Sequence, residues 1–185
     1  MVFSLLMRET YLALALSLYT ISLPTDTLRF EFNRVHNWQV ILDGVMGGRS
    51  RGEVTYENGL MRFTGALSLA NSGGFASVRS PYARHDFSKF TQAIIRYRAE
   101  GHGTFALVLE DAEPYYEPKY RYTLPFSEEW QEVTIPLEDF KAFRLGRPLG
   151  YAFGPKNKAI LRIGLIKADK DTRPFAIEVD YLRFR

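Results

Sequence analysis

The 185-residue sequence contains no cysteine and only three histidines. The absence of cysteine excludes disulfides, thiolate nucleophiles and cysteine-ligated zinc. The histidines His36, His85 and His102 lie far apart and show neither H-x-x-x-H nor H-x-H spacing, so no metal site is expected. The chain also lacks a P-loop and a G-x-G-x-x-G motif that opens a helix, and Ser50 and Ser77 lack the strand-to-helix elbow of a hydrolase nucleophile. We therefore expect no cofactor.

Neither sign of charge dominates the sequence. It has 24 Lys and Arg against 21 Asp and Glu, a formal net charge of +3 at pH 7. This mild balance does not favour a nucleic acid as partner. The hydrophobic content of 46% suffices for one core, and no repeat or linker divides the chain after its first two dozen residues. We therefore expect a single domain over residues 24–185.

The uncharged segment Tyr11–Leu23 is thirteen residues long, whereas a membrane-spanning helix needs about twenty. Its five leucines, and Pro24 directly after it, predict that residues 1–23 form a secretory signal peptide. The alternative is an uncleaved N-terminal hydrophobic helix that packs on the domain or lies at a membrane surface. A cleaved signal would place the domain outside the cytoplasm; otherwise it is cytoplasmic or membrane-associated.

From Leu28 onward the hydrophobic pattern has a period of two, which is typical of half-buried strands. Alternation marks Leu28–Phe32, Phe105–Leu109, Tyr120–Leu124 and Phe175–Tyr181. Further strands are expected at Trp38–Leu42, Val54–Tyr56, Leu60–Thr64, Phe75–Arg79, Ala93–Arg98, Gln131–Ile135 and Leu161–Lys167. Short strands separated by Gly, Pro and Asn predict an all-β, antiparallel β-sandwich.

Two details of this pattern can be checked directly. The only helix expected inside the domain is Leu137–Phe143. In the last strand, Tyr181 is expected on the same face as Val179, while Glu178 and Asp180 occupy the exposed face.

Two glycine pairs form the most informative pattern of the chain. Gly47 and Gly48 lie in the run DGVMGGRS, and Gly73 and Gly74 lie in NSGGF. Paired glycines suit positive φ or close backbone approach. Asp43 is expected to accept hydrogen bonds from the backbone of the glycine turn that follows it. The motif is either a shape-defining element of the core or a contact surface, and its candidate residues are Asp43, Met46, Gly47, Gly48, Arg49, Ser50, Asn71, Gly73, Gly74 and Phe75.

Arginines and tyrosines provide further binding candidates. Arg79, with Arg49 and Arg51, would bind a carboxylate or phosphate, or would pair with Asp43 and Glu53. The segment 141–158 carries five positive charges and no acid, which suits an anionic partner or a solvated loop; its candidates are Arg144 and Arg147. Stacked tyrosines suit a glycan or a protein interface, with Tyr115 and Tyr116 as candidates, whereas Tyr120 and Tyr122 fit a cross-strand ladder.

Several motifs together resemble the family of complex I intermediate-associated protein 30. The resemblance rests on Trp38–Gly52, Phe63–Gly65, Leu67–Arg79, Trp130–Phe140 and Pro174–Asp180. It implies a jelly-roll β-sandwich similar to galactose-binding domains. It also implies a non-catalytic protein that holds assembly intermediates of respiratory complex I, so that the partner is a protein, with association at a membrane surface.

Two alternatives come from other functional classes. If residues 1–23 are a cleaved signal, an extracytoplasmic carbohydrate-binding module with a glycan partner is the alternative. A glycoside hydrolase is the other, because Glu178 and Asp180 would share one strand face about 7 Å apart.

Overall fold

The computed structural model describes residues 27–33, 37–150 and 159–185. Within these ranges every regular element is a β-strand or a short 3₁₀ turn, and none is an α-helix. The N-terminal hydrophobic segment and the last part of the basic segment lie outside the described residues. The division at residue 23 therefore stays a prediction.

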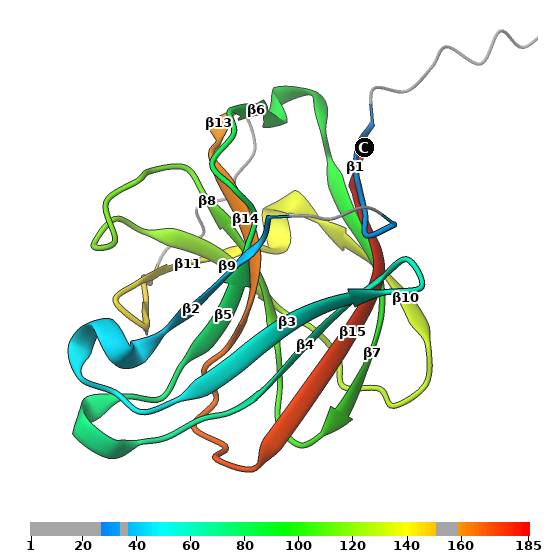
Figure 1. The fold of residues 1–185 in the computed structure, drawn as a ribbon. Coiled ribbons are helices and arrows are strands. Elements are labelled where there is room, and N and C mark those ends of the chain that lie inside the picture. Colours follow the sequence, from blue (N-terminus) through cyan, green and yellow to red (C-terminus); the bar gives the residue numbers. More distant parts are fainter. Residues whose placement is uncertain (1–26, 34–36, 151–158) are drawn as a thin grey trace, which may run out of the picture.

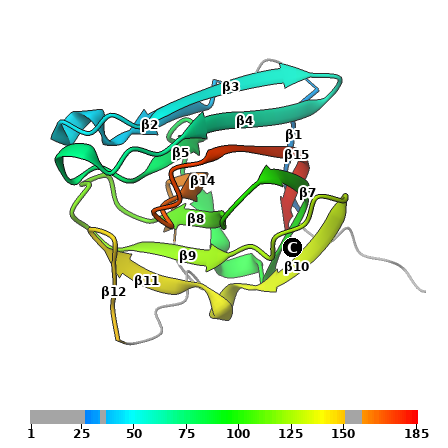
Figure 2. The same ribbon diagram turned by 90° about the horizontal axis from the view of Figure 1, so that it is seen from below.

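Two antiparallel sheets form the layers of a β-sandwich (Figures 1 and 2). The six-stranded sheet has the order β10 (Gln131–Pro136), β7 (Gln92–Gly101), β15 (Pro174–Phe184), β4 (Leu60–Ala66) and β3 (Arg51–Glu57), and β1 (Leu28–Glu31) also pairs with β15. The seven-stranded sheet has the order β12 (Arg147–Pro148), β11 (Lys141–Arg144), β9 (Lys119–Thr123), β8 (Ala106–Glu110), β14 (Arg162–Lys167), β5 (Ala76–Arg79) and β2 (Gln39–Leu42). A small third sheet pairs β6 (His85–Asp86) with β13 (Ala159–Ile160).

The core lies between the two sheets and is rich in aromatic rings. Phe63 and Phe105 both contact Phe175, with ring centroids 5.3 and 5.6 Å apart. From the seven-stranded sheet, Leu107 and Leu109 are fully buried against this cluster. Alternate residues of each strand thus point inward, as the period-two pattern predicts. The all-β sandwich expected from the sequence is confirmed.

A β-bulge in β15 changes which residues face the core. The register against β7 shifts between Val179 and Tyr181, so Asp180 is an extra residue. Before the bulge Val179 is buried, whereas after it the buried residues are Leu182 and Phe184. The expectation that Tyr181 continues the inward face is therefore wrong, because one unpaired residue reverses the alternation.

The expected helix at Leu137–Phe143 is also wrong. Leu137–Asp139 forms a single 3₁₀ turn, η4, and Lys141–Arg144 is strand β11 paired with β9. All the strands that the sequence predicts are present, with ends within a few residues of those expected. The two-residue strands β6, β12 and β13 were not expected, because they are too short to show a hydrophobic period.

The bulge provides a test of the fold. Deleting both Asp180 and Tyr181 should turn Leu182 and Phe184 outward and unfold the domain at room temperature, since it moves both side chains by one register position to the other face. Deleting Asp180 alone should leave the domain folded, because Val179 and Tyr181 already pair with the consecutive residues Tyr97 and Arg96. The control Asp180→Ala keeps the bulge and loses only a half-exposed pair with Arg96, so it should cost less than about 1 kcal/mol. Circular dichroism melting of these variants measures this, and a double-deletion variant that melts like the wild type contradicts the assignment.

Candidate functional site

The two glycine motifs form adjoining loops at one edge of the sandwich (Figure 1). The first, with the 3₁₀ turn η1 (Asp43–Met46), leads from β2 to β3; the second, with η2 (Ala70–Ser72), leads from β4 to β5. Because β2 pairs with β5 and β3 pairs with β4, the two loops lie side by side. Asn71 Nδ2 donates to the carbonyl of Gly47 at 2.9 Å. We call these residues, 43–50 and 68–75, the loop pair.

The Asp43 carboxylate joins the two loops from inside. It is fully buried and accepts hydrogen bonds from Ser50 N at 3.0 Å and Ser50 Oγ at 2.5 Å in its own loop. From the second loop it accepts from Gly74 N at 2.6 Å and Phe75 N at 3.3 Å. Ser50 Oγ in turn accepts from Ser68 N at 2.9 Å. The bonds expected from the glycine turn directly after Asp43 are not made by its side chain, because Gly48 N donates to the Asp43 backbone oxygen.

These hydrogen bonds keep Asp43 ionised. Burial acts to raise its pKa, but hydrogen bonds from Ser50, Gly74 and Phe75 outweigh that effect and hold the pKa below the usual value of 3.8. No cation among the described residues pairs with Asp43. A buried carboxylate held by several uncharged donors is typical of a structural group that organises the backbone.

In each glycine pair one glycine has a positive φ and the other lies close to Asp43. Gly47 and Gly74 have φ values of +84° and +125°, in the region where side chains are strained. Gly48 and Gly73 instead lie against Asp43: a Cβ on Gly48 would be 2.3 Å from Asp43 Cγ, and one on Gly73 would be 2.6 Å from Asp43 Oδ2. Both kinds of glycine are therefore required for the loops to close around one carboxylate.

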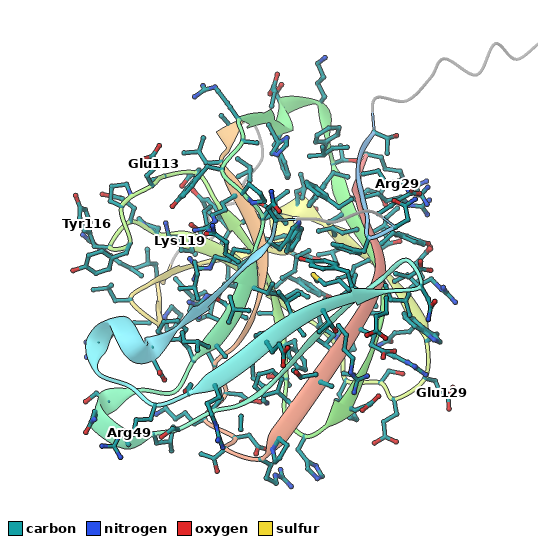
Figure 3. All side chains as sticks on the ribbon, viewed as in Figure 1. Arg29, Arg49, Glu113, Tyr116, Lys119 and Glu129 are labelled. Atoms are coloured by element: carbon teal, nitrogen blue, oxygen red, sulfur yellow. The ribbon has the colours of Figure 1, made fainter. Side chains whose placement is uncertain are left out.

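The outer side of the loop pair carries exposed apolar and polar groups. Met46 is 58% exposed and Leu69 is 48% exposed. Arg49 and Asn71 are also exposed, and Figure 3 shows Arg49 at the outer edge of the molecule. Leu69 was not among the residues expected from the sequence, because it precedes the second glycine motif, NSGGF.

The tyrosine and basic candidates meet at another edge. Tyr115 and Tyr116 are exposed, with rings edge to face at 5.6 Å. Arg144 Nε donates to the backbone oxygen of Tyr116 at 3.0 Å, and Arg144 lies opposite Arg147 across the β11–β12 hairpin. Tyr120, by contrast, is buried in the core.

Arg79 lies apart from both groups. It is at the far end of β5 from the loop pair and pairs with Glu110 at 2.6 Å, so the expected alternatives of Asp43 and Glu53 as partners are wrong. Around it the outer face of the seven-stranded sheet gathers Lys119, Arg121 and Arg162. These three were not predicted from the sequence, because only the pairing of β9, β8, β14 and β5 brings them beside Arg79.

Glu178 and Asp180 both pair with arginines. Glu178 is 9% exposed, not solvated as expected, and accepts from Arg62 Nη1 at 2.5 Å and Arg98 Nε at 2.6 Å. Burial acts to raise its pKa, but the two arginines lower it below the usual value. Asp180 accepts from Arg96 on the other side of the bulge.

No group of three or more His, Cys, Asp or Glu side chains among the described residues is placed to hold a metal ion. No helix within the described ranges is long and apolar enough to cross a membrane.

The fold defines the class of the protein as a jelly-roll β-sandwich domain. Residues 28–179 match the family model described as complex I intermediate-associated protein 30. The chain therefore belongs to the complex I intermediate-associated protein 30 family, as its glycine motifs predict.

Solved structures with the same fold include carbohydrate-binding modules. The family 11 module of a cellulosomal cellulase of Clostridium thermocellum is 13% identical, with a TM-score of 0.64 over 86% of this chain and 94% of the module. A family 30 module is 16% identical, with a TM-score of 0.53 over 85% of this chain and 87% of the other. At these identities the similarity shows the fold alone.

The steric role of the glycines can be tested with a matched pair. Gly48→Ala should lower the free energy of unfolding by more than about 1 kcal/mol, because the new methyl group would displace the buried Asp43 carboxylate. Gly44→Ala, where nothing lies within 4 Å of the added Cβ, should change it by less than about 0.5 kcal/mol. Urea unfolding measures both, and equal values for the two variants would falsify the steric role.

The depressed pKa of Asp43 predicts an acid dependence. A carboxyl whose pKa is lowered on folding contributes stability above its unfolded pKa, near 3.8, and this contribution disappears as pH falls through the folded pKa. Asp43→Asn should be about 1–3 kcal/mol less stable at pH 7, because its amide opposes the donors of Gly74 and Phe75. The difference from the wild type should shrink below about pH 4. Urea titrations at several pH values measure it, and a pH-independent difference contradicts the assignment.

Proposed function

We propose that this chain is a non-catalytic binding domain that holds a protein partner through the loop pair. The partner class that family membership favours is an assembly intermediate of respiratory complex I. The observation that carries the proposal is the fully buried Asp43 carboxylate, whose hydrogen bonds fix two loops that present Met46 and Leu69 to solvent.

Preorganisation supports a binding role for these loops. A loop that is ordered before association loses less conformational entropy when a partner binds, and so binds more tightly for the same contacts. The loop pair is held by the Asp43 hydrogen bonds and by the bond from Asn71 to Gly47. Its exposed side chains include Met46 and Arg49, and Met and Arg are enriched in protein interfaces.

The pairing of Glu178 and Asp180 supports a binding domain over a hydrolase. Glycoside hydrolysis needs one carboxyl with a raised pKa as general acid. Arg62 and Arg98 act on Glu178 in the opposite direction, and Arg96 binds Asp180. This pair is therefore suited to stabilising the outer face of the six-stranded sheet.

The partner surface can be tested by charge insertion. Met46→Asp combined with Leu69→Asp should leave the free energy of unfolding within about 1 kcal/mol, because both side chains are exposed. The variant should lose affinity for its partner by at least about 30-fold, the effect of losing a central apolar contact. The measurement is co-purification of complex I subunits from membranes with the tagged protein, followed by titration of the captured subunit.

Thr55→Asp is the matched control. Thr55 is exposed on β3, away from both loops, so this variant should capture the same subunits as the wild type. Full capture by the Met46 and Leu69 variant, or equal loss in the control, contradicts the loop pair as the partner surface.

A carbohydrate-binding module is the second candidate, favoured by the exposed pair Tyr115 and Tyr116. Figure 3 shows Tyr116 at the outer edge of the molecule. A family 11 module of the same fold has been solved with a β-1,3-1,4-mixed-linked tetrasaccharide. Stacking of a neutral glycan on tyrosine should be nearly indifferent to salt, whereas a partner held by Arg144 and Arg147 should bind more weakly as salt rises. Glycan-array binding that is unchanged by salt and absent in Tyr116→Ala would favour this candidate.

A further inference from the structure

A cluster of cations on the outer face of the seven-stranded sheet lies beyond the proposed function. Strand register aligns these side chains in two neighbouring rows. One row runs across six strands and is made of Gln39, Arg79, Gly164, Val108, Arg121 and Lys141. The next row is made of Arg162, Glu110, Lys119 and Phe143. Both rows point away from the core, since their strand neighbours Leu107 and Leu109 point into it.

Glu110 is the centre of the cluster. It is 2% exposed, and its Oε1 lies 2.6 Å from Arg79 Nη1 while its Oε2 lies 3.5 Å from Lys119 Nζ. Lys119 also donates to the backbone oxygens of Ala112 and Pro114. These contacts fix the positions of the two cations nearest the carboxylate.

The two remaining arginines are held differently. Arg162 is 5% exposed, donates to the backbone oxygen of Ser80 at 2.8 Å, and lies over the exposed ring of Tyr82 at 4.6 Å. Arg121 lies over the ring of Phe143 at 5.0 Å. Among the described residues, buried Nε atoms of Arg79 and Arg121 have no hydrogen-bond partner.

Positive charge in the cluster exceeds negative charge by three. Four cations surround one carboxylate, and the part of the chain that the structure describes pairs no other acid with them. Burial and the positive charge of Arg79 together lower the pKa of Arg121 to about 10, although Glu110 acts to raise it. Burial likewise lowers the pKa of Arg79, with Arg162 adding to the effect. Such crowding is unfavourable unless a further anion is present.

Gly164 gives Arg79 its position in the row. A Cβ on Gly164 would lie 2.6 Å from the backbone oxygen of Val78 and 2.8 Å from Arg79 Cγ. With only hydrogen there, the Arg79 side chain extends across β14 to reach Glu110 on β8. The arginine fork is thereby brought toward Arg121, which occupies the same row two strands beyond Gly164.

We propose that this cluster binds a single oxyanion, a carboxylate or phosphate group of a small ligand. Guanidinium groups with free N–H donors bind both groups with bidentate geometry. The ligand is small because Arg79, Lys119 and Arg162 are mostly buried, so that a flat macromolecular surface cannot reach them together. Glu110 holds the cations in place while leaving their charge in excess. The site is at the opposite end of β5 from the loop pair, so it can be tested separately from the proposed function.

The experiment measures ligand-induced stabilisation of the full chain, dialysed into a low-salt chloride buffer. Inorganic phosphate and D-glucuronate are the anionic probes, and D-glucose is the neutral one. Either anion should raise the melting temperature, because a ligand that binds only the folded state stabilises it. Glucose should have no effect. A rise with glucuronate alone identifies a carboxylate as the preferred group, and a rise with phosphate alone identifies phosphate.

Arg121→Met is the decisive variant, because it removes one charge and keeps most of the packing on Phe143. It should melt at a higher temperature than the wild type without anion and should lose the anion-induced rise. The matched control is Arg29→Met, on β1 of the other sheet and exposed to solvent, which should keep that rise. Arg121→Lys retains the charge but loses the fork, and should bind about tenfold more weakly by calorimetry.

Four results would overturn the proposal. The first is no rise with either anion in the wild type. The second is an equal rise in the wild type and Arg121→Met, which is a general salt effect on the protein surface. The third is undiminished binding by Arg121→Lys. Destabilisation by Arg121→Met without anion would assign the cluster a purely structural role and also overturn it.

Discussion

The buried Asp43 carboxylate is the interaction on which the edge of the sandwich depends. Both loops that it joins are connections between the two sheets: one leads from β2 to β3 and the other from β4 to β5. Because its acceptors bind donors from both loops, one side chain fixes how the sheets meet at that edge. Buried carboxylates are costly unless they are fully hydrogen-bonded, so the local sequence is tightly constrained. Gly48 and Gly73 follow from this constraint, since a larger residue at either position would displace the carboxylate.

Most of the fold could be predicted because each long strand shows the alternation of apolar and polar residues in its own sequence. The pattern could not show where the period breaks: the bulge at Asp180 depends on how β15 pairs with β7 in its two halves, and no local residue marks it. The helix predicted after Pro136 was wrong for a related reason. Leu137 and Phe140 are three residues apart, which is helical spacing, yet a 3₁₀ turn also places both in the core before β11 pairs with β9. The pairing of β11 with β9 therefore outweighed the helical spacing of the local sequence.

The candidate site was predictable in its residues but not in its connections. Both glycine pairs stand out in the sequence, and the two loops do come together. The sequence did not show that Ser50 and the second loop donate hydrogen bonds to Asp43. The pairing of β2 with β5 brings Gly74, which is 31 residues from Asp43 in the chain, within hydrogen-bond distance of its carboxylate. The exposure of Leu69 could not be predicted from its position in the sequence. Its neighbour Leu67 is buried while Leu69 is exposed, and alternation alone does not tell which loop residues leave the core.

The outer faces of the two sheets differ in how they balance buried charge. On the six-stranded sheet, Arg62, Arg96 and Arg98 are matched by acids, with Glu178 bound by two of them. On the seven-stranded sheet, the cations around Glu110 are not matched by acids among the described residues. Ion pairs that serve only stability are expected to balance, because an unpaired buried charge destabilises the fold. An external anion would therefore relieve repulsion on the outer face of the seven-stranded sheet. The ion pairs on the outer face of the six-stranded sheet are balanced, so their role is to stabilise the fold.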